Sequence, residues 1–393
     1  MPFLFGNEHL VVAAFFTFII YLAKGNKLDR VVITYCVIFA VLFILQALAF
    51  NQFVLSKFLA YYLRIFYAYF TIKIVKDDID VILINQIYFF CITSLIITLT
   101  FIIFPNTIDY AYDALVPIGD AITLNKSTRQ HFVIYTMELG WQTEIARNSG
   151  PFWEPGGFGV FIYLAFIFNL IKQGTFFNKK NVIFILTLIS TQSTTAYLAF
   201  FVFCSLYILL TKKVSTSFLL LPIIIVISIS LYSSVDFLGM KIENMINDSQ
   251  TMGKQQVYSR VVSGNVNVDR FLSSPIFGIG RFYVDEDDFS PGNNGTTLLL
   301  AEFGIIGFFF YFLYMFRSYR NYCEEHNFNT RIPIAIVAGW LVLGYSQGIF
   351  QKSFFFGLSF MFLVGKYAKH SVDYKITNFK KKFPTLINDA GKV

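Results

Sequence analysis

The stretch VVITYCVIFAVLFILQALAF at residues 31–50 contains no charged side chain. About 20 apolar residues form a helix long enough to cross the roughly 30 Å hydrocarbon core of a bilayer. Comparable apolar blocks, each of about 15–24 residues, recur along the chain. The strands of a membrane β-barrel would instead alternate in polarity over about ten residues. The chain is therefore predicted to be an all-α protein, a polytopic bundle of transmembrane helices.

The composition of the 393 residues supports this prediction, because 56% are hydrophobic, only 14% are charged and the mean hydropathy is +0.60. Soluble domains carry about 25% charged residues, so a soluble globular protein, a disulfide-rich secreted scaffold and a disordered chain are excluded. The net charge of +7 is attributed to Lys and Arg on cytoplasmic loops, and no nucleic-acid partner is expected. None of the four cysteines has an obvious disulfide partner.

The apolar blocks predict about eleven crossings, within a range of 10 to 12. The expected helices lie at 3–23, 31–50, 53–75, 81–104, 157–171, 181–193, 195–211, 216–235, 295–316, 333–350 and 353–367. This divides the chain into helices over 1–104, a large outer loop over 105–156, helices over 157–235, a second large outer loop over 236–294, helices over 295–367 and a basic tail over 368–393. Outer loops of this length are uncommon unless they are functional.

The distribution of Lys and Arg predicts the orientation. If the N-terminus faces outward, every short inner segment carries at least two cations, and the tail from Lys366 carries many more. Cytoplasmic loops are enriched in Lys and Arg. We therefore expect the N-terminus outside and the C-terminus in the cytoplasm.

A polar break, STQSTT at residues 190–195, divides the apolar run 181–211. Polar backbone at membrane depth is tolerated where it is buried in protein or lines a cavity. The break is therefore either a plain hairpin turn or a cavity-lining turn that presents Gln192.

Where the first outer loop re-enters the membrane, residues 147–159 read RNSGPFWEPGGFG. Gly and Pro favour a rigid turn, and Phe152 and Trp153 suit the headgroup level. Arg147 and Glu154 are then expected at the membrane surface, within reach of a lipid-borne phosphate. The alternative is a structural turn closed by a salt bridge.

Further cations are candidates for binding an anion. The second outer loop carries Arg260, Arg270 and the segment SSPIFGIGRF at 273–282, which ends near Arg281. Guanidinium groups bind phosphate oxygens through two hydrogen bonds at once. Lys57 and Arg64 are seven residues apart in a predicted span, on nearly the same helix face. Charges inside a span usually face the bundle interior or a water-filled cavity, although Lys57 can also reach the outer interface.

Motifs for nucleotide or metal chemistry are missing from the sequence. The short G-x-G lacks the strand–helix context of a dinucleotide fingerprint, and there is no Walker A or zinc-protease motif. The four histidines are scattered, and no Cys or His pair has ligand spacing. We expect neither a cofactor nor a metal.

Four segments, in their order along the chain, resemble the superfamily of O-antigen ligases and Wzy-type O-antigen polymerases. They are RNSGPFWEPGGFG at 147–159, LTLISTQSTTAYL at 186–198, SSPIFGIGRF at 273–282 and NNGTTLLLAEFGIIG at 293–307. Each segment is degenerate alone, but their order among ten to twelve helices with two large outer loops is moderately specific. The resemblance implies a GT-C-like glycosyltransferase of the bacterial inner membrane. Such an enzyme acts at the periplasmic face on an undecaprenyl-diphosphate-linked oligosaccharide, without a metal and with inversion.

The resemblance also assigns roles to residues. It makes Arg147, Glu154, Arg260 and Arg281 the catalytic candidates. Independently of it, the candidates for substrate binding are Lys57, Arg64, His131, Gln192, Arg270, Asn293 and Asn294. Glu154 or His131 would accept the proton of the acceptor hydroxyl, if a base is needed at all. Ligases usually have His-Asn where this chain has Asn293-Asn294, which favours a polymerase over a ligase.

The expected partners are lipid-linked donor and acceptor glycans, the bilayer, and flippase and chain-length regulator proteins. A ligase or protein O-oligosaccharyltransferase is an alternative, and so is a flippase or transporter with Lys57 and Arg64 along its pathway. A transporter should show repeats or an inverted pair of broken helices, and the sequence indicates neither.

Overall fold

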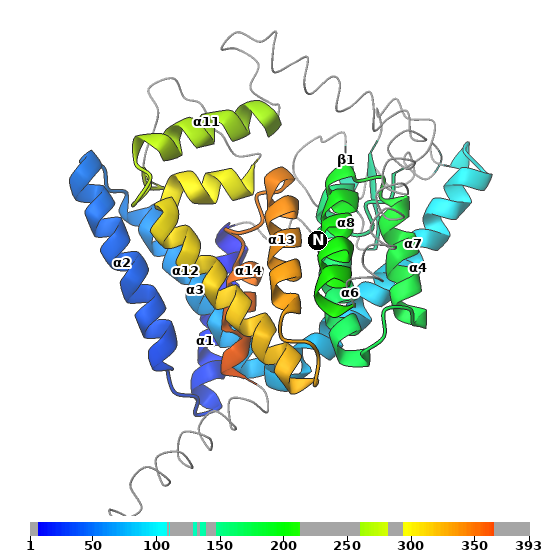
Figure 1. Cartoon of the computed structure of the whole chain (residues 1–393), viewed down its shortest axis with the longest axis horizontal. Helices are drawn as coiled ribbons and strands as arrows, with labels where there is room; N and C mark the ends of the chain where they lie inside the picture. Colours follow the sequence, from blue (N-terminus) through cyan, green and yellow to red (C-terminus); the bar gives the residue numbers. More distant parts are fainter. Residues whose placement is uncertain are drawn as a thin grey trace, which may run out of the picture.

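The structure is a computed structural model that describes residues 7–107, 110, 129–131, 134–138, 147–212, 260–281 and 294–364. These residues form helices and one small antiparallel sheet (Figure 1). The α-helices are α1 (Asn7–Ala23), α2 (Arg30–Phe50), α3 (Leu55–Val75), α4 (Ile79–Ile103), α6 (Pro155–Gln173), α7 (Lys179–Ser190), α8 (Thr194–Thr211), α11 (Arg260–Ser273), α12 (Gly295–Glu325), α13 (Ile332–Ser346) and α14 (Ser353–Phe360). Two 3-10 turns, η2 (Lys76–Asp78) and η3 (Met361–Leu363), and the strands β1 (Arg129–His131) and β2 (Thr136–Glu138) complete the described part.

The helices confirm a membrane protein with several spans. In the described residues, six helices are long and apolar enough to cross a membrane: α2, α3, α4, α6, α8 and α12. Three shorter apolar helices accompany them, at Leu10–Ala23, Ile332–Ser346 and Ser353–Leu363. Large apolar side chains such as Leu48 and Ile96 are exposed on this surface, as expected where a helix faces lipid.

Each expected span that falls within the described residues coincides with a helix. The expected span at 216–235, the basic tail over 368–393 and most of both large loops lie outside the described residues. The total of eleven crossings and the GT-C-like arrangement therefore stay predictions.

The helices form two groups that meet at α13. In Figure 1, α1, α2, α3, α12 and α14 lie on one side and α4, α6, α7 and α8 on the other. α13 packs against both α12 and α8 and so joins the groups. α6 is the most enclosed of the candidate spans, since 83% of its apolar window is buried.

The two ends of the bundle differ in what they carry. At one end, which we name the outer end after the predicted topology, Figure 1 shows α11, the β1–β2 ribbon and the start of α6. At the opposite, inner end lie the connections α1–α2, α3–α4 and α12–α13. The described elements therefore alternate between ends in the order that the sequence predicts.

Polar side chains cap the first turns of two helices at the outer end. Asn294 accepts a hydrogen bond from the backbone N–H of Thr297 at the start of α12 (3.1 Å). Ser193 accepts one from Ala196 at the start of α8 (3.4 Å). Such side chains satisfy donors that the first turn leaves free. The polar break at 190–195 thus becomes a short turn between α7 and α8.

Three elements differ from the sequence-based expectation. α13 ends at Ser346 instead of residue 350, because Gln347 is extended. α12 continues to Glu325, beyond residue 316, because Tyr319, Tyr322 and Cys323 are buried in the bundle. The β1–β2 ribbon, within the expected first outer loop, is not predicted from the sequence; the hydroxyl of Tyr135, just before β2, forms a hydrogen bond with the hydroxyl of Thr98 in α4 (3.1 Å).

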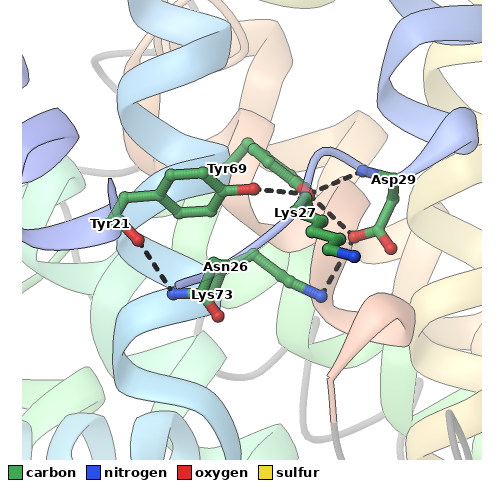
Figure 2. A network of polar contacts seen from close by, with 6 residues as sticks. All are labelled: Tyr21, Asn26, Lys27, Asp29, Tyr69 and Lys73. Carbon is green, nitrogen blue, oxygen red and sulfur yellow. Dashed lines mark hydrogen bonds and ion pairs between the residues drawn. The ribbon is translucent and has the colours of Figure 1, made fainter. Parts of the chain in front are cut away.

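Carboxylates at the inner end are held by a cation and a tyrosine. Asp29 forms an ion pair with Lys73 (3.0 Å) and accepts a hydrogen bond from Tyr69 (2.8 Å), as Figure 2 shows. The backbone N–H of Asp29 donates back to the Tyr69 hydroxyl (3.0 Å). These contacts fasten the α1–α2 connection to α3.

A second inner carboxylate, Asp80, is almost fully buried. It accepts hydrogen bonds from Lys172 (2.8 Å) and Tyr322 (2.7 Å), and its other oxygen accepts from the N–H of Val81 (2.7 Å). Because these donors come from α6, α12 and α4 itself, Asp80 ties three helices together.

Candidate functional site

The candidate site starts from a break in α12. At Gly304 the backbone has φ +59° and ψ −171°, which is not helical. A Cβ at this position would collide with the carbonyl of Ile276, so only glycine fits. In Figure 1 the first part of α12, drawn in yellow, lies across the bundle beneath α11, and the longer part runs toward the inner end.

The segment 275–280 satisfies the backbone groups that the break releases. The N–H groups of Ile279 and Gly280 donate to the carbonyls of Ala301 (2.9 Å) and Glu302 (3.1 Å). After the break, the N–H groups of Ile305 and Ile306 donate to the carbonyls of Pro275 (2.9 Å) and Ile276 (3.3 Å).

Gln46 of α2 adds a clamp, because its amide donates to the carbonyls of both Phe277 and Glu302. The sequence segments 273–282 and 293–307 therefore form one unit.

This unit brings Arg281 to Glu302. The Arg281 Nε lies 3.6 Å from a Glu302 carboxylate oxygen, and both side chains are largely buried, at 15% and 13% exposed. Gln351 completes a triangle by accepting from Arg281 (2.9 Å) and donating to Glu302 (2.8 Å). The Arg281 guanidinium also lies 5.4 Å from the ring centre of Tyr61, a favourable cation–π distance.

Three more cations surround this triangle. Arg64 of α3 donates to the carbonyl of Gln351 (3.4 Å), and its charge acts on both Arg281 and Glu302. Lys57 lies seven residues before Arg64 on nearly the same face of α3, and it also interacts electrostatically with Glu302. Lys352 interacts electrostatically with Arg64. We name Lys57, Arg64, Arg281, Lys352 and Glu302 the outer cation cluster.

Among the described residues, the outer cation cluster holds more cations than carboxylates. Arg281, Lys57 and Arg64 interact with Glu302, and Lys352 lies near enough to Arg64 for their like charges to repel. Lys57 and Lys352 are exposed, whereas Arg64, Arg281 and Glu302 lie deeper. The cluster therefore opens at the surface of the outer end. An anion with two or more oxygens would compensate the excess charge and accept the guanidinium hydrogen bonds.

The re-entry segment 147–154 forms a second polar group beside it. Arg147 donates to the carbonyl of Gln192 in the α7–α8 turn (3.1 Å). Asn148 is fully buried and donates to Ser94 (3.1 Å) and Ser190 (2.9 Å). These contacts fix the segment against α4 and α7 and join it to the turn at 190–195.

The loop 347–352 between α13 and α14 connects the two groups. At one end of the loop, the Gln347 amide donates to Glu154. At the other end, Gln351 contacts Arg281 and Glu302. The loop thus places the re-entry segment and the outer cation cluster on either side of itself.

The structure brings the sequence-predicted residues together to different degrees. Lys57, Arg64 and Arg281 share one cluster, and Arg147 contacts Gln192 directly. Glu154 contacts Gln347 in the loop that leads to the cluster. Asn294 caps α12, and Arg270 lies in the last turn of α11. Arg260 begins α11 and His131 lies in β1, but their side chains lie outside the described residues, as does Asn293 altogether.

Five residues of the site are not predicted from the sequence: Gln46, Glu302, Gln347, Gln351 and Lys352. Glu302 carried a usable signal, because it is a charged residue within a predicted span, the same argument that selected Arg64. The glutamines carried none, since an uncharged amide near a helix end is ordinary until its long-range partner is known.

Among the described residues, no group of three or more His, Cys, Asp and Glu side chains is arranged to hold a metal ion. All four cysteines are free.

Comparison of the chain with protein-family models, with curated proteins and with solved structures finds no match.

Proposed function

We propose that the chain is a glycosyltransferase of the bacterial inner membrane that polymerises undecaprenyl-diphosphate-linked oligosaccharide repeat units of an O-antigen, capsule or exopolysaccharide. The observation that carries the proposal is the outer cation cluster, in which three cations interact with Glu302 and a fourth, Lys352, lies near Arg64 at one end of a membrane bundle. A lipid-borne diphosphate is an anion whose oxygens suit these cations.

In the proposed reaction, the cluster binds the diphosphate of the donor. A hydroxyl of the acceptor glycan attacks the anomeric carbon from the opposite face, and the bond from that carbon to the diphosphate oxygen breaks. The electron pair leaves with the diphosphate, where Arg281 and Arg64 stabilise the developing charge. The hydroxyl proton passes to Glu154 or to the released diphosphate.

The order of the contacts supports this division of roles. Arg281 approaches from the segment 273–282 and Glu154 from the segment 147–159, and the loop 347–352 touches both side chains. The donor diphosphate and the acceptor hydroxyl need such neighbouring positions, because in-line transfer brings the reacting atoms to about 3–3.5 Å.

The proposal is tested with the purified chain in lipid nanodiscs, supplied with undecaprenyl-diphosphate-linked repeat units and analysed for glycan ladders. We expect the wild type to form a ladder and Arg147→Ala to lose it. Arg320→Ala is the matched control, because Arg320 is exposed at the inner end and pairs with Glu324 (3.0 Å). Equal ladders from the wild type and Arg147→Ala would refute the assignment of Arg147.

The same assay separates the related activities. Transfer of the glycan to lipid A core or to a protein, without ladder formation, would identify a ligase or protein O-oligosaccharyltransferase. Translocation of the lipid-linked glycan without a new glycosidic bond would identify a flippase. A flippase has one structural observation in its favour, the break in α12 at Gly304, since transporters bind substrate at interrupted helices.

A further inference from the structure

Helix α11 turns a polar side toward the protein. Ser263, Gly264 and Asn267 are buried, whereas Val268 and Leu272 are 39% and 63% exposed. A helix that packs on an apolar core buries its apolar side instead. The surface that α11 covers is therefore built for polar contacts.

Four polar atoms on this surface lack hydrogen-bond partners within the part of the chain that the structure describes. They are Ser263 Oγ, Asn267 Oδ1, Asn294 Nδ2 and Ser346 Oγ, and all four side chains are at least nine-tenths buried. Exchanging the two amide atoms of Asn267 still leaves one of them without a partner. Buried polar groups in proteins are nearly always hydrogen-bonded, so a local group of exceptions calls for a ligand or ordered water.

Contacts of Asn267, of Asn294 and of Gly264 and Tyr345, the chain neighbours of Ser263 and Ser346, bring the four side chains to one junction. Asn267 donates to the Thr297 hydroxyl (3.1 Å), and the N–H of Thr297 donates to Asn294 (3.1 Å). A Cβ on Gly264 would lie 2.9 Å from Asn294 Nδ2 and 3.2 Å from the hydroxyl of Tyr345. The group therefore lies where α11, the first turn of α12 and the end of α13 meet.

The chemistry of the group is neutral, with hydroxyls and amides that can both donate and accept. This matches the hydroxyl groups of a sugar ring, whereas none of these four side chains carries a charge to balance that of a phosphate. Two chain segments connect the group to the outer cation cluster. Residues 274–280 lead from α11 to Arg281, and residues 347–351 lead from α13 to Gln351.

We propose that α11, α12 and α13 form here a subsite for an uncharged sugar ring, and that α11 moves away from α12 to admit it. The helix can move because the side it presents to α12 is polar and small, and water can replace those contacts. The identity of the ligand, the first sugar of a lipid-linked glycan, rests on the proposed function.

The test compares two probes on the full chain in nanodiscs: undecaprenyl diphosphate and undecaprenyl diphosphate-N-acetylglucosamine. We expect the wild type to bind the glycosylated lipid about tenfold more tightly, the effect of one or two hydrogen bonds. Asn267→Ala and Ser346→Ala should bring the ratio of the two affinities close to one and leave the affinity for undecaprenyl diphosphate unchanged.

Matched controls are available in the same chain. Asn265 is the exposed asparagine of α11, and Ser359 on α14 is another buried serine whose Oγ has no partner among the described residues. Asn265→Ala and Ser359→Ala should keep the wild-type ratio. A wild-type ratio of one, or a ratio that Asn267→Ala leaves unchanged, would overturn the subsite and indicate ordered water only.

Failure of the subsite and failure of the proposed function give different results. If the wild type binds neither lipid, the proposed function fails. Hydrogen exchange of the α11 backbone with soluble N-acetylglucosamine oligosaccharide then tests the subsite alone. A changed exchange rate in the wild type that Asn267→Ala abolishes supports the sugar subsite, and an unchanged rate overturns it.

Discussion

The two ends of the bundle bury the same kinds of charged residue in different proportions. At the inner end, Asp80 and Asp29 each form an ion pair with one lysine and accept a hydrogen bond from one tyrosine. At the outer end, Glu302 is the one carboxylate of the described cluster, and it interacts with three cations, Lys57, Arg64 and Arg281. The inner groups are structural ties between helices, whereas the outer cation cluster holds more cations than carboxylates among the described residues.

The difference teaches that a buried charge is informative mainly through its partners. Removing a charge from water is costly in either place, and a well-placed partner repays the cost. Where each acid has its own cation and hydroxyl donor, the result holds helices together. Where several cations gather around one acid, the arrangement indicates a candidate site for an anion.

The largest expected effect comes from breaking the outer cation cluster. Arg281→Ala should lower the rate of ladder formation by about 100-fold or more, the usual effect of losing one charged stabiliser of a transition state. Arg281→Lys should restore only part of the rate, because an ammonium cannot reproduce the contacts of Arg281 with both Gln351 and Glu302. A ladder assay on protein amounts matched by immunoblot measures both variants; wild-type rates in Arg281→Ala would remove this residue from the mechanism.

The next effect concerns stability at the inner end. Asp80→Asn should lower the free energy of unfolding by about 2 kcal/mol, below the 3–5 kcal/mol of a fully buried pair because Lys172 is partly exposed. Unfolding in mixed micelles with increasing denaturing detergent measures it. Asp78→Asn, on an exposed neighbour in η2, is the control and should cost much less. The folded fraction of Asp80→Asn should bind undecaprenyl diphosphate like the wild type. Weaker binding would show that a residue of the inner end also affects the ligand site.

Glu302→Gln tests the charge imbalance itself. The variant keeps an oxygen that can accept from Gln351 and removes the one negative charge, so undecaprenyl diphosphate should bind about three- to tenfold more tightly, with a steeper salt dependence. Glu324→Gln at the inner end should not change the affinity. Weaker binding by Glu302→Gln would mean that Glu302 positions Arg281 more than it competes with the ligand.

The smallest effect is expected for Lys73→Met. Asp29 keeps its hydrogen bond from Tyr69, and partly exposed ion pairs contribute little, so the loss of unfolding free energy should be about 0.5 kcal/mol. The same unfolding assay measures it. A loss of ladder formation at unchanged protein amount would show that the inner end also takes part in function.

The helices could be predicted largely from the sequence, because length and apolarity decide where a membrane helix lies. The run 31–50 became α2 almost residue for residue. The break at Gly304 was not predicted, since it depends on the segment 275–280 supplying hydrogen bonds from a distant part of the chain. The early end of α13 at Ser346 also depends on distant parts of the chain, because the loop that follows it donates hydrogen bonds to Glu154 and Glu302.

The site was predictable one residue at a time. Arg64 stood out as a cation within an apolar span, and Arg281 as a cation after a glycine-rich segment. The structure places both in one cluster. Their shared partner Gln351 had no local signal. Whether the cluster binds a diphosphate stays a prediction, because no comparison with a known protein bears on it.

The hydrogen bond from Arg64 to Gln351 joins residues 287 positions apart, which has a consequence for how the chain is made. α3 is among the first helices to enter the bilayer, and its hydropathy of 1.3 is the lowest of the six candidate spans. The ribosome must add α12 and α13 before Arg64 can meet Arg281, Glu302 and Gln351. A chain that stops before residue 347 should therefore hold α3 poorly in the membrane, and membrane quality control should degrade it while its helices are still individually intact.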